Sequence, residues 1–389
     1  AIEFISAGSV LPAMVSDLGG PEWLVSLMPV MMMTGIMLPA LFTAHWIDRL
    51  RRFHPLLVLV GVFQRLPYLA AGLILLGFGA ERRSLALAAV ALAPLAAGIV
   101  GGLTFTAWQQ LVLRTVPPQR RSSVFAIRYT IGSLTGVLAG WVVAHTLEQY
   151  PGAAGYGRLF LYSFGMMALS YAAFLTIREP VEKTPPENGR VGLLTNMKRV
   201  PALFRSDHAF PRFLLTILLL NGIFVVAPFL AIHACDMLDK PRSFLGRLLV
   251  AQMVGAVCGN GFAGIAGDRS GGRRVLQACL VATLACALAG TLSRHEWGFY
   301  AAFFALGFAM YTRRVGCHAL SLDLAPPERR STFLAVVNFV QLVSLLAGSG
   351  LSLLAWRRGG TLAVNAALAV ILSAGALLAL RRVREPRTE

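Results

Sequence analysis

Apolar residues occur along the chain in stretches of about 20 positions, separated by short polar segments. Residues 55–78, for example, contain a single charged residue, Arg65. A helix needs about 20 mostly apolar residues to cross a bilayer, and in hydrocarbon its backbone polar groups must pair within the segment. The pattern therefore predicts twelve membrane-spanning helices. Their approximate ranges are 1–17, 23–46, 55–79, 84–113, 123–146, 158–177, 209–235, 243–266, 274–293, 297–323, 331–355 and 360–381.

The first of these stretches begins with the chain and is slightly short, so we expect native residues to precede it. A cleaved signal peptide is the competing interpretation of this end. It is disfavoured because residues 1–17 have no basic region before the apolar stretch and no small-residue cleavage site.

Charged residues make up 14% of the chain and the mean hydropathy is +0.67, whereas about a quarter of the residues of a soluble protein are charged. The net charge of +17 would suit a nucleic-acid partner, but the basic residues are sorted by side. With a cytoplasmic N-terminus, 22 of them fall in inner segments and 9 in outer segments. Positive residues favour the cytoplasmic side, so we expect both termini in the cytoplasm and no nucleic-acid partner. No N-x-[ST] acceptor occurs, which suits a bacterial inner membrane.

The chain also repeats itself. A loop after the second stretch contains Asp48, and a loop after the eighth contains Asp268, 220 residues later; each aspartate is followed at once by arginine. The segment VPPQRRSSVF at 116–125 matches APPERRSTFL at 325–334. These matches in the same order predict two six-helix halves, 1–178 and 209–382. Two further pairs share the offset of 220, Pro21 with Pro241 and Gly35 with Gly255.

One long polar stretch, residues 179–208, lies between the halves, and its Pro, Glu and Lys content predicts a cytoplasmic linker. From Gly192 to Phe204 apolar and basic residues alternate, so this part could lie as an amphipathic helix on the inner leaflet. A solvated tether fits equally well. Residues 383–389 are expected to form a cytoplasmic tail.

Two six-helix halves, a basic linker and a repeated Asp-Arg loop after helices 2 and 8 resemble the major facilitator superfamily over the whole chain. The loop pattern of the superfamily is G-x-x-x-D-R-x-G-R-R. The second half fits it from Asp268 to Arg274 with one extra glycine, whereas Ala44 and Arg51 replace the two glycines in the first half. The resemblance implies that helices 1, 4, 7 and 10 surround a central cavity, with alternating access by rocking of the halves.

No subfamily follows from the sequence. Drug antiporters of the superfamily usually carry G-P-x-x-G-G in helix 5, and here that helix reads IGSLTGVLAGWVV, without proline. Gly132, Gly136 and Gly140 recur in it every four residues, which predicts close packing against another helix.

The Asp-Arg loops are our candidates for a conformational switch. Charge pairs at cytoplasmic helix ends can hold the two halves together in one conformation and release them in the other. The alternative is that the arginines only set the topology, but recurrence at matching places favours the switch. The candidate residues are Asp48, Arg49, Arg52, Asp268, Arg269, Arg273 and Arg274.

Arginines inside predicted spans each cost about 2.5–3.5 kcal/mol and should face protein, water or a partner. In helix 10, Tyr311, Arg314 and His318 share one face with Gly307. Because the resemblance places helix 10 at the cavity, we take Arg314 as the candidate for binding an anionic solute, with Arg313 as an equal alternative. A structural arginine, paired with backbone carbonyls or a buried acid, has equal weight. The arginines within spans are Arg65, Arg128, Arg313 and Arg314.

Glu3 is the only acidic residue well inside a span. A lone buried carboxylate can load and release a proton, or it can be the fixed partner of a buried arginine. We therefore take Glu3 as the candidate for proton coupling, with His233 as a second candidate. A single histidine on an apolar helix is, however, more often only packed and hydrogen-bonded.

Polar and aromatic residues of helices 4, 7 and 11 are further candidates for lining the solute pathway. Taken singly, each fits helix–helix hydrogen bonding or packing better. These candidates are Trp108, Gln109, Asn221, Asn338 and Gln341.

The sequence contains no metal-ligand cluster, no G-x-S-x-G and no phosphate loop, so we expect neither an enzyme nor a cofactor or metal site. Our first hypothesis is a monomeric secondary transporter in the lipid bilayer that moves a small, anionic organic solute, with proton coupling. A lipid or amphiphile flippase, or a drug efflux protein, of the same fold is the alternative. A transport-inactive scaffold or sensor is a third, disfavoured by the retained Asp-Arg loops and intramembrane arginines.

Overall fold

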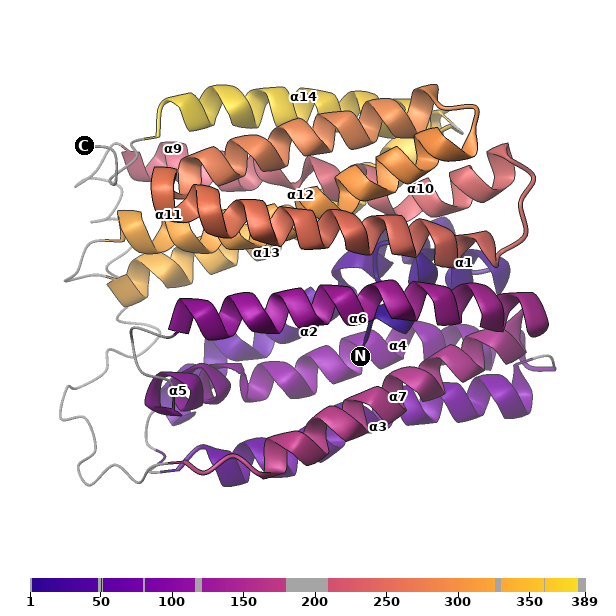
Figure 1. Cartoon of the computed structure of the whole chain (residues 1–389), viewed down its shortest axis with the longest axis horizontal. Coiled ribbons are helices and arrows are strands. Elements are labelled where there is room, and N and C mark those ends of the chain that lie inside the picture. Colours follow the sequence, from indigo (N-terminus) through magenta and orange to yellow (C-terminus); the bar gives the residue numbers. More distant parts are fainter. Residues whose placement is uncertain are drawn as a thin grey trace.

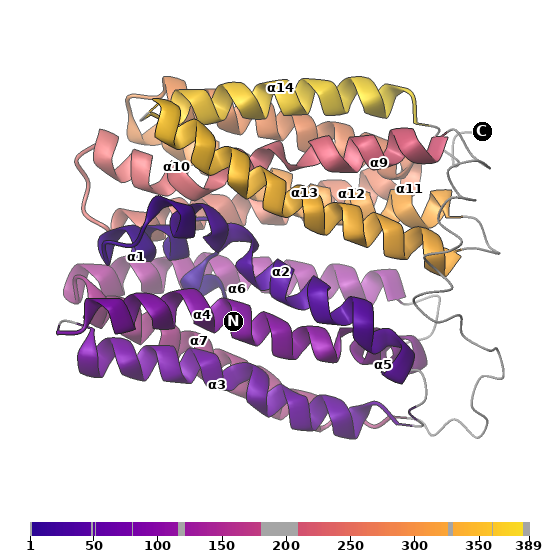
Figure 2. The same ribbon diagram turned by 180° about the vertical axis from the view of Figure 1, so that it is seen from behind.

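The protein is all-helical in the part of the chain that the computed structural model describes. Its helices run side by side along the long axis of the molecule, with the N-terminal half on one side and the C-terminal half on the other (Figures 1 and 2). The described residues are 2–47, 50, 52–79, 81–115, 121–179, 209–325, 330–359 and 361–383.

The N-terminal half contains the six predicted spans, two of them broken. The first is a 3-10 turn and a short helix separated by a turn that includes Gly8, a poor helix former. The fourth is broken at Thr104, whose hydroxyl donates to the carbonyl of Gly101 at 3.4 Å, a side-chain bond that competes with the helix. Its elements are η1 (Ile2–Ile5), α1 (Val10–Asp17), α2 (Glu22–Ile47), α3 (His54–Phe78), α4 (Arg83–Leu103), α5 (Phe105–Thr115), α6 (Arg121–Gln149) and α7 (Ala153–Leu175).

The C-terminal half differs from the predicted spans at two points. Helix 7 is kinked at Asn221, which has φ −90° and ψ 19°. Helices 8 and 9 are joined in one long helix that doubles back at Gly271, whose φ of 77° favours glycine (Figure 1). Its elements are α9 (Ala209–Leu219), η3 (Leu220–Gly222), α10 (Ile223–Met237), α11 (Phe244–Leu292), α12 (Glu296–Leu324), α13 (Arg330–Gly359) and α14 (Leu362–Arg381).

Nine helices of the described chain are long and apolar enough to cross a membrane. Because α11 doubles back, it supplies two crossings. The count leaves out α1, which is only 8 residues long, and α12, whose hydropathy is lowered by Arg313 and Arg314. With these included, the fold has the twelve predicted membrane-spanning helices.

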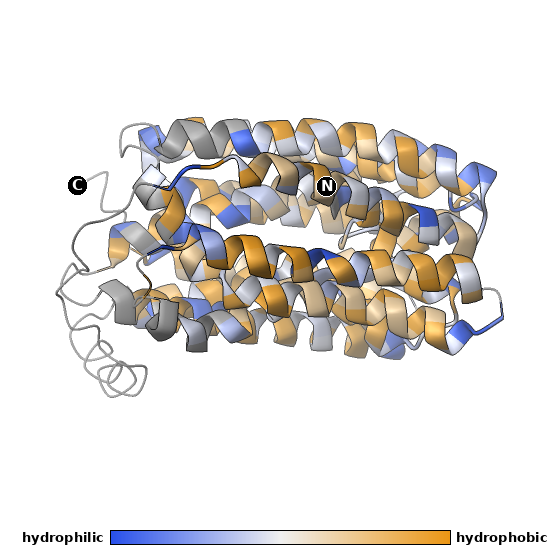
Figure 3. Ribbon diagram, turned by 90° about the horizontal axis from the view of Figure 1, so that it is seen from below, coloured by the Kyte–Doolittle hydropathy of each residue, from blue (hydrophilic) through white to orange (hydrophobic). Residues whose placement is uncertain are grey.

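The outer surface of the bundle is suited to lipid. Large apolar side chains are exposed along it, with Trp141 on α6 78% exposed and Leu138, one turn before it, 68% exposed. Apolar residues cover the length of the bundle, and hydrophilic residues are more frequent at its two ends (Figure 3). A soluble protein rarely exposes apolar patches of this extent, so the chain is an integral membrane protein.

The repeat inferred from the sequence is visible in the packing of matching helices. A Cβ atom on Gly35 would lie 2.7 Å from the carbonyl oxygen of Leu95 on α4, and one on Gly255 would collide with the carbonyl of Phe304 on α12. Helix 2 therefore approaches helix 4 through a glycine in the first half, as helix 8 approaches helix 10 in the second. The matched prolines, Pro21 and Pro241, both lie in the turn before the second helix of their half.

The two halves meet along α6 and α11. A Cβ atom on Gly140 would lie 2.8 Å from the carbonyl of Gly246, and one on Gly136 would lie 2.5 Å from the sulfur of Met253. Gly132 has no such neighbour, so the predicted close packing is confirmed at two of the three glycines. Nearer the middle of the bundle, the amide of Asn260 donates to the hydroxyl of Ser133 at 3.2 Å.

Candidate functional site

Glu3 and Tyr311 join the two halves at mid-length of the bundle. Glu3 lies in the 3-10 turn η1, and Tyr311 lies at the middle of α12. The Tyr311 hydroxyl donates to Oε1 of Glu3 at 3.3 Å. The Cγ atom of Glu3 would lie 3.4 Å from a Cβ atom on Gly136, so the Glu3 side chain passes close to α6 at this glycine. The break in helix 1 is what places a carboxylate between α6 and α12.

Beside Glu3 and Tyr311, two arginines, one from each half, lie near the same tyrosine ring. The guanidinium carbon of Arg314 on α12 lies 4.8 Å from the centre of the Tyr129 ring. That of Arg128 on α6 lies 5.7 Å from the same ring and 4.7 Å from the Trp108 ring on α5. Arg314 is close enough to Glu3 for their charges to interact. We call Glu3, Arg128, Tyr129, Tyr311 and Arg314 the central cluster.

Arg128 and Tyr129 were not among the site residues predicted from the sequence. Arg128 was recognised as an arginine inside a span, which is a signal of a polar environment. The glycines of helix 5 predict only the face that packs against another helix, which is α11. They do not predict which residues Arg128 contacts. Tyr129 carries no signal of its own in the sequence.

The predicted face of helix 10 is divided in the structure. His318 lies on the same exposed side as Arg314, close enough for their charges to interact. Gly307, by contrast, packs against the backbone of Gln252 on α11. Arg313 points elsewhere, with its guanidinium carbon 5.1 Å from the centre of the Phe224 ring on α10. The two arginines of helix 10 are therefore not equivalent.

Arg65 shows what a structural arginine looks like in this fold. Its Nε donates to the carbonyl of Met167 at 2.9 Å, and its Nη1 donates to the carbonyl of Gly61. The guanidinium carbon also lies 4.3 Å from the centre of the Tyr171 ring. Arg65 therefore fastens α3 to α7 within the N-terminal half.

The remaining polar candidates have varied surroundings. Asn221 donates to the hydroxyl of Ser344 at 2.6 Å and is buried, so it links helix 7 to helix 11. Trp108 contacts Arg128, as described above. Gln109 and Asn338 are exposed and Gln341 is half-buried. His233 lies edge-on to Phe299, with 6.0 Å between ring centres, towards the far end of α10 and away from the central cluster.

The predicted switch residues fall only partly within the described chain. Asp48 and Arg49 lie outside the described residues, and Arg52 is exposed. In the second half, Arg273 donates to the carbonyl of Arg381 at 3.1 Å, and Arg274 donates to the hydroxyl of Ser270 at 2.9 Å. Asp268 and Arg269 are exposed. These two hydrogen bonds join residues of the C-terminal half.

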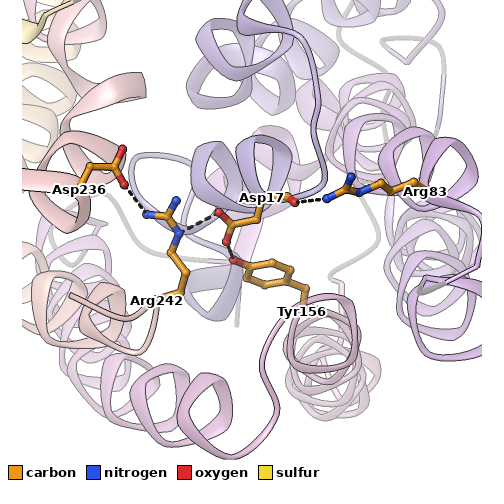
Figure 4. Close-up of polar contacts among 5 residues, drawn as sticks. All are labelled: Asp17, Arg83, Tyr156, Asp236 and Arg242. Carbon is orange, nitrogen blue, oxygen red and sulfur yellow. Dashed lines mark hydrogen bonds and ion pairs between the residues drawn. The ribbon is translucent and has the colours of Figure 1, made fainter. Parts of the chain in front are cut away.

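A second polar network joins the two halves at the opposite end of the bundle, the predicted outer end (Figure 4). Asp17, at the end of α1, accepts a hydrogen bond from the Tyr156 hydroxyl on α7 and pairs with Arg242 of the other half, with 2.8 Å from Nε to Oδ1. Arg242 also pairs with Asp236 at 3.5 Å, and Arg83 donates to the backbone carbonyl of Asp17 at 3.4 Å. The Asp17 carboxylate thus ties helix 1 to helix 6 and to the C-terminal half.

Arg242 of this network favours its charged form. The neighbouring Asp17 carboxylate outweighs partial burial and raises the pKa of Arg242 above its ordinary value. Arg242 and Asp17 have 29% and 20% of their side-chain surfaces exposed, so water screens the pair less than it screens a surface pair. A second pair across the halves, Arg357 with Glu22 at 3.4 Å, is more exposed, at 59% and 48%.

A bundle of twelve spans in two similar halves, with charged residues held at mid-length between them, defines a membrane transporter of the two-repeat class. A family model for the Major Facilitator Superfamily matches residues 1–238 and 213–389. The chain belongs to this superfamily and is a secondary transporter that acts on small-molecule solutes. A comparison with curated proteins finds no match.

Solved structures agree in fold over nearly the whole chain. The nucleoside transporter NupG is 12% identical, with 98% of this chain and 94% of that chain covered and a TM-score of 0.69. A D-xylose-proton symporter is 15% identical, with 100% and 96% covered and a TM-score of 0.67. A bacterial homolog of the human lysosomal transporter Spinster, in an inward-facing and unoccupied conformation, is 15% identical, with 98% and 93% covered and a TM-score of 0.61.

Proposed function

We propose that the protein moves a small anionic organic solute across the membrane together with a proton. The observation that supports this most is the surroundings of Arg314. Its guanidinium is exposed beside Tyr129 at the boundary of the two halves and has no ion-pair partner within hydrogen-bonding distance among the described residues. An arginine kept inside a membrane without a tight partner is costly, and an anionic solute would offset that cost.

Glu3 is the proposed proton carrier. It is the acidic residue of the central cluster, it is partly buried, and its hydrogen-bond partner among the described residues is the Tyr311 hydroxyl, which can donate to either oxygen. While Glu3 is ionised, it attracts Arg314 and competes with the solute for it. Protonation removes that competition, so proton and solute binding favour each other. One of the similar structures is a proton symporter, of D-xylose, which agrees with coupling of this kind in the same fold.

The other assignments follow from the same topology. We infer that both termini and the linker of residues 179–208 face the cytoplasm, that the membrane is a bacterial inner membrane, and that the protein works as a monomer without enzymatic activity. The Asp-Arg loops are proposed to act as the conformational switch at the cytoplasmic end. Arg52, Asp268, Arg269, Arg273 and Arg274, with Asp48 and Arg49, would make their contacts across the halves in the outward-open state.

A lipid flippase of the same fold is the second candidate function. Exposed apolar residues on α6, such as Leu138 and Trp141, would suit a lateral path for acyl chains. Two arginines at mid-length of the bundle suit a compact anion better, because an amphiphile keeps its charged headgroup near the membrane surface.

The experiment is a thermal-stability screen of the purified full chain against organic acids, neutral sugars and nucleosides, cationic drugs and lysolipids. Anions should raise the unfolding temperature of the parent protein and leave that of the Arg314→Ala variant unchanged. If only neutral or cationic compounds, or lysolipids, stabilise the parent protein, the proposed function is wrong.

A further inference from the structure

The two guanidiniums of the central cluster come from opposite halves yet face one ring. Arg128 belongs to α6 and Arg314 to α12, and their guanidinium carbons lie 5.7 Å and 4.8 Å from the centre of the Tyr129 ring. Both side chains are exposed. A single small molecule beside Tyr129 could therefore contact both arginines at once.

The charges of the cluster do not balance. The cluster contains two guanidiniums and one carboxylate, that of Glu3, which is hydrogen-bonded to Tyr311. Among the described residues, the contacts of Arg128 and Arg314 are with aromatic rings, which hold a cation by only about 0.5–2 kcal/mol. Like charges this close also repel each other. With Glu3 protonated, the cluster keeps two positive charges, and two negative charges would neutralise it.

We propose that the solute is an organic dianion that bridges the two halves, with one negative charge bound by Arg128 and the other by Arg314. This inference rests on the proposed function, since it names the class of anion that the same site takes. Each guanidinium can bind a carboxylate or phosphate through two parallel hydrogen bonds. A monoanion would leave one arginine without a counter-charge.

Bridging also links binding to the movement of the halves. A dianion held by one arginine from each half pulls those halves together around Tyr129, as a ligand must do if it favours a closed state. Dicarboxylates and phosphate monoesters supply the same pair of charges with different spacing. The experiment distinguishes these two sources.

The test compares dianions with matched compounds of lower charge, using the purified full chain in nanodiscs at pH 7, which is above the second pKa of a phosphate monoester. Binding is measured by calorimetry for succinate against butyrate, phthalate against benzoate, and glycerol 3-phosphate against the monoanionic methyl ester of its phosphate. We expect at least one dianion to bind about tenfold or more tightly than its mate, because a hydrogen-bonded charge pair is worth about 1.5–3 kcal/mol. The pair that shows the preference identifies a dicarboxylate or a phosphate monoester as the source.

Variants then show whether the two arginines carry the preference. Arg128→Gln and Arg314→Gln should each bind the dianion and its mate with similar affinity, whereas Arg65→Lys, an arginine far from the cluster, should keep the preference. If Arg128→Gln keeps it while Arg314→Gln loses anion binding, the dianion inference is overturned and the proposed function stands. If no dianion binds more tightly than its matched compound of lower charge, the dianion inference is also overturned. If no anion binds and neutral compounds do, both the dianion inference and the proposed function are wrong.

Discussion

Arginines inside the membrane have different roles at the residue scale, and their contacts distinguish them. Arg65 donates to two backbone carbonyls on α3 and α7, which satisfies much of its guanidinium. Arg314 contacts a tyrosine ring and lies near a carboxylate at the boundary of the halves. Spacing in the sequence identified both as intramembrane. It could not separate them, because the partner carbonyl of Met167 is about a hundred residues from Arg65.

The first prediction concerns the charge and the shape of residue 314. Arg314→Ala should weaken binding of the anion selected by the stability screen about tenfold or more, since a charge-assisted hydrogen bond is worth about 1.5–3 kcal/mol. Arg314→Lys keeps the positive charge but loses the planar guanidinium that forms two parallel hydrogen bonds. Its affinity for the anion should therefore lie between those of the parent protein and Arg314→Ala. Isothermal titration measures all three proteins. If Arg314→Ala binds like the parent protein, the arginine is structural.

Glu3→Gln tests proton coupling. Glutamine keeps an oxygen that accepts the hydrogen bond from Tyr311 but carries no proton to release. Uptake into proteoliposomes should therefore lose its response to an imposed pH gradient, while exchange of labelled for unlabelled solute continues. Glu148→Gln, an exposed acid at the end of α6, is the matched control and should respond as the parent does. If uptake by Glu3→Gln still responds to the pH gradient, another group carries the proton.

At the scale of elements, the spans could be predicted from apolar length, but their breaks could not. The interruption of helix 4 at Thr104 lies inside one continuous predicted span, and the turn before α1 contains Gly8, which packs near Gln252 of the other half. Such breaks depend on tertiary contacts that hydropathy does not record. They matter for function, because the break in helix 1 brings Glu3 to the central cluster.

One helix start is fixed by a residue distant in sequence. Oε2 of Glu179, just after α7, accepts hydrogen bonds from the backbone N–H groups of Phe53 and His54 at 2.8 Å each, at the start of α3. These N–H groups have no partner within the helix, and a carboxylate there also complements the helix dipole. Glu179 therefore ties the end of helix 6 to the start of helix 3.

Removing this cap should destabilise the N-terminal half. Glu179→Ala is expected to cost about 1 kcal/mol, as for other helix caps, and Glu179→Gln should cost less because its carbonyl oxygen still accepts. The measurement is the midpoint of reversible denaturant unfolding in detergent, with the exposed Glu148→Ala as the control. Equal midpoints for Glu179→Ala and the control would show that the cap contributes nothing.

On the scale of the whole molecule, the sequence repeat was sufficient to predict two six-helix halves. The match of Gly35 with Gly255 proved to be a match of helix contacts, because each glycine lets its helix approach the next-but-one helix of its half. The central cluster was predicted only in part. The sequence identifies Glu3, Arg128, Tyr311 and Arg314 as charged or polar residues within spans. That Arg128 and Tyr129 belong to the cluster depends on how α6 is rotated against α12, which the sequence of one half does not determine.

The pairing of Asp17 with Arg242 leads to a prediction about the conformation of the whole molecule. It joins the two halves at the predicted outer end, so opening that end requires breaking a partly buried pair at 2.8 Å (Figure 4). Asp17→Asn removes the charge and should favour opening by about 1 kcal/mol, roughly a fivefold change in the ratio of the two states. The matched control is Glu22→Gln at the same end, because the Glu22–Arg357 pair is more exposed and at 3.4 Å.

The populations can be measured as distances between spin labels on a cysteine-free background. Labels at Glu81→Cys in the N-terminal half and Trp297→Cys in the C-terminal half occupy exposed positions at this end. Asp17→Asn should shift the distance distribution towards longer values, since the ends of the halves separate as the outer side opens. Glu22→Gln should leave the distribution close to that of the parent, because pairs with both partners this exposed contribute little. If both variants shift the distance distribution equally, the difference in burial between the two ion pairs does not determine which pair holds the halves together. If neither variant shifts it, the outer end is held closed by the packing of α6 against α11 at Gly140 and Gly246.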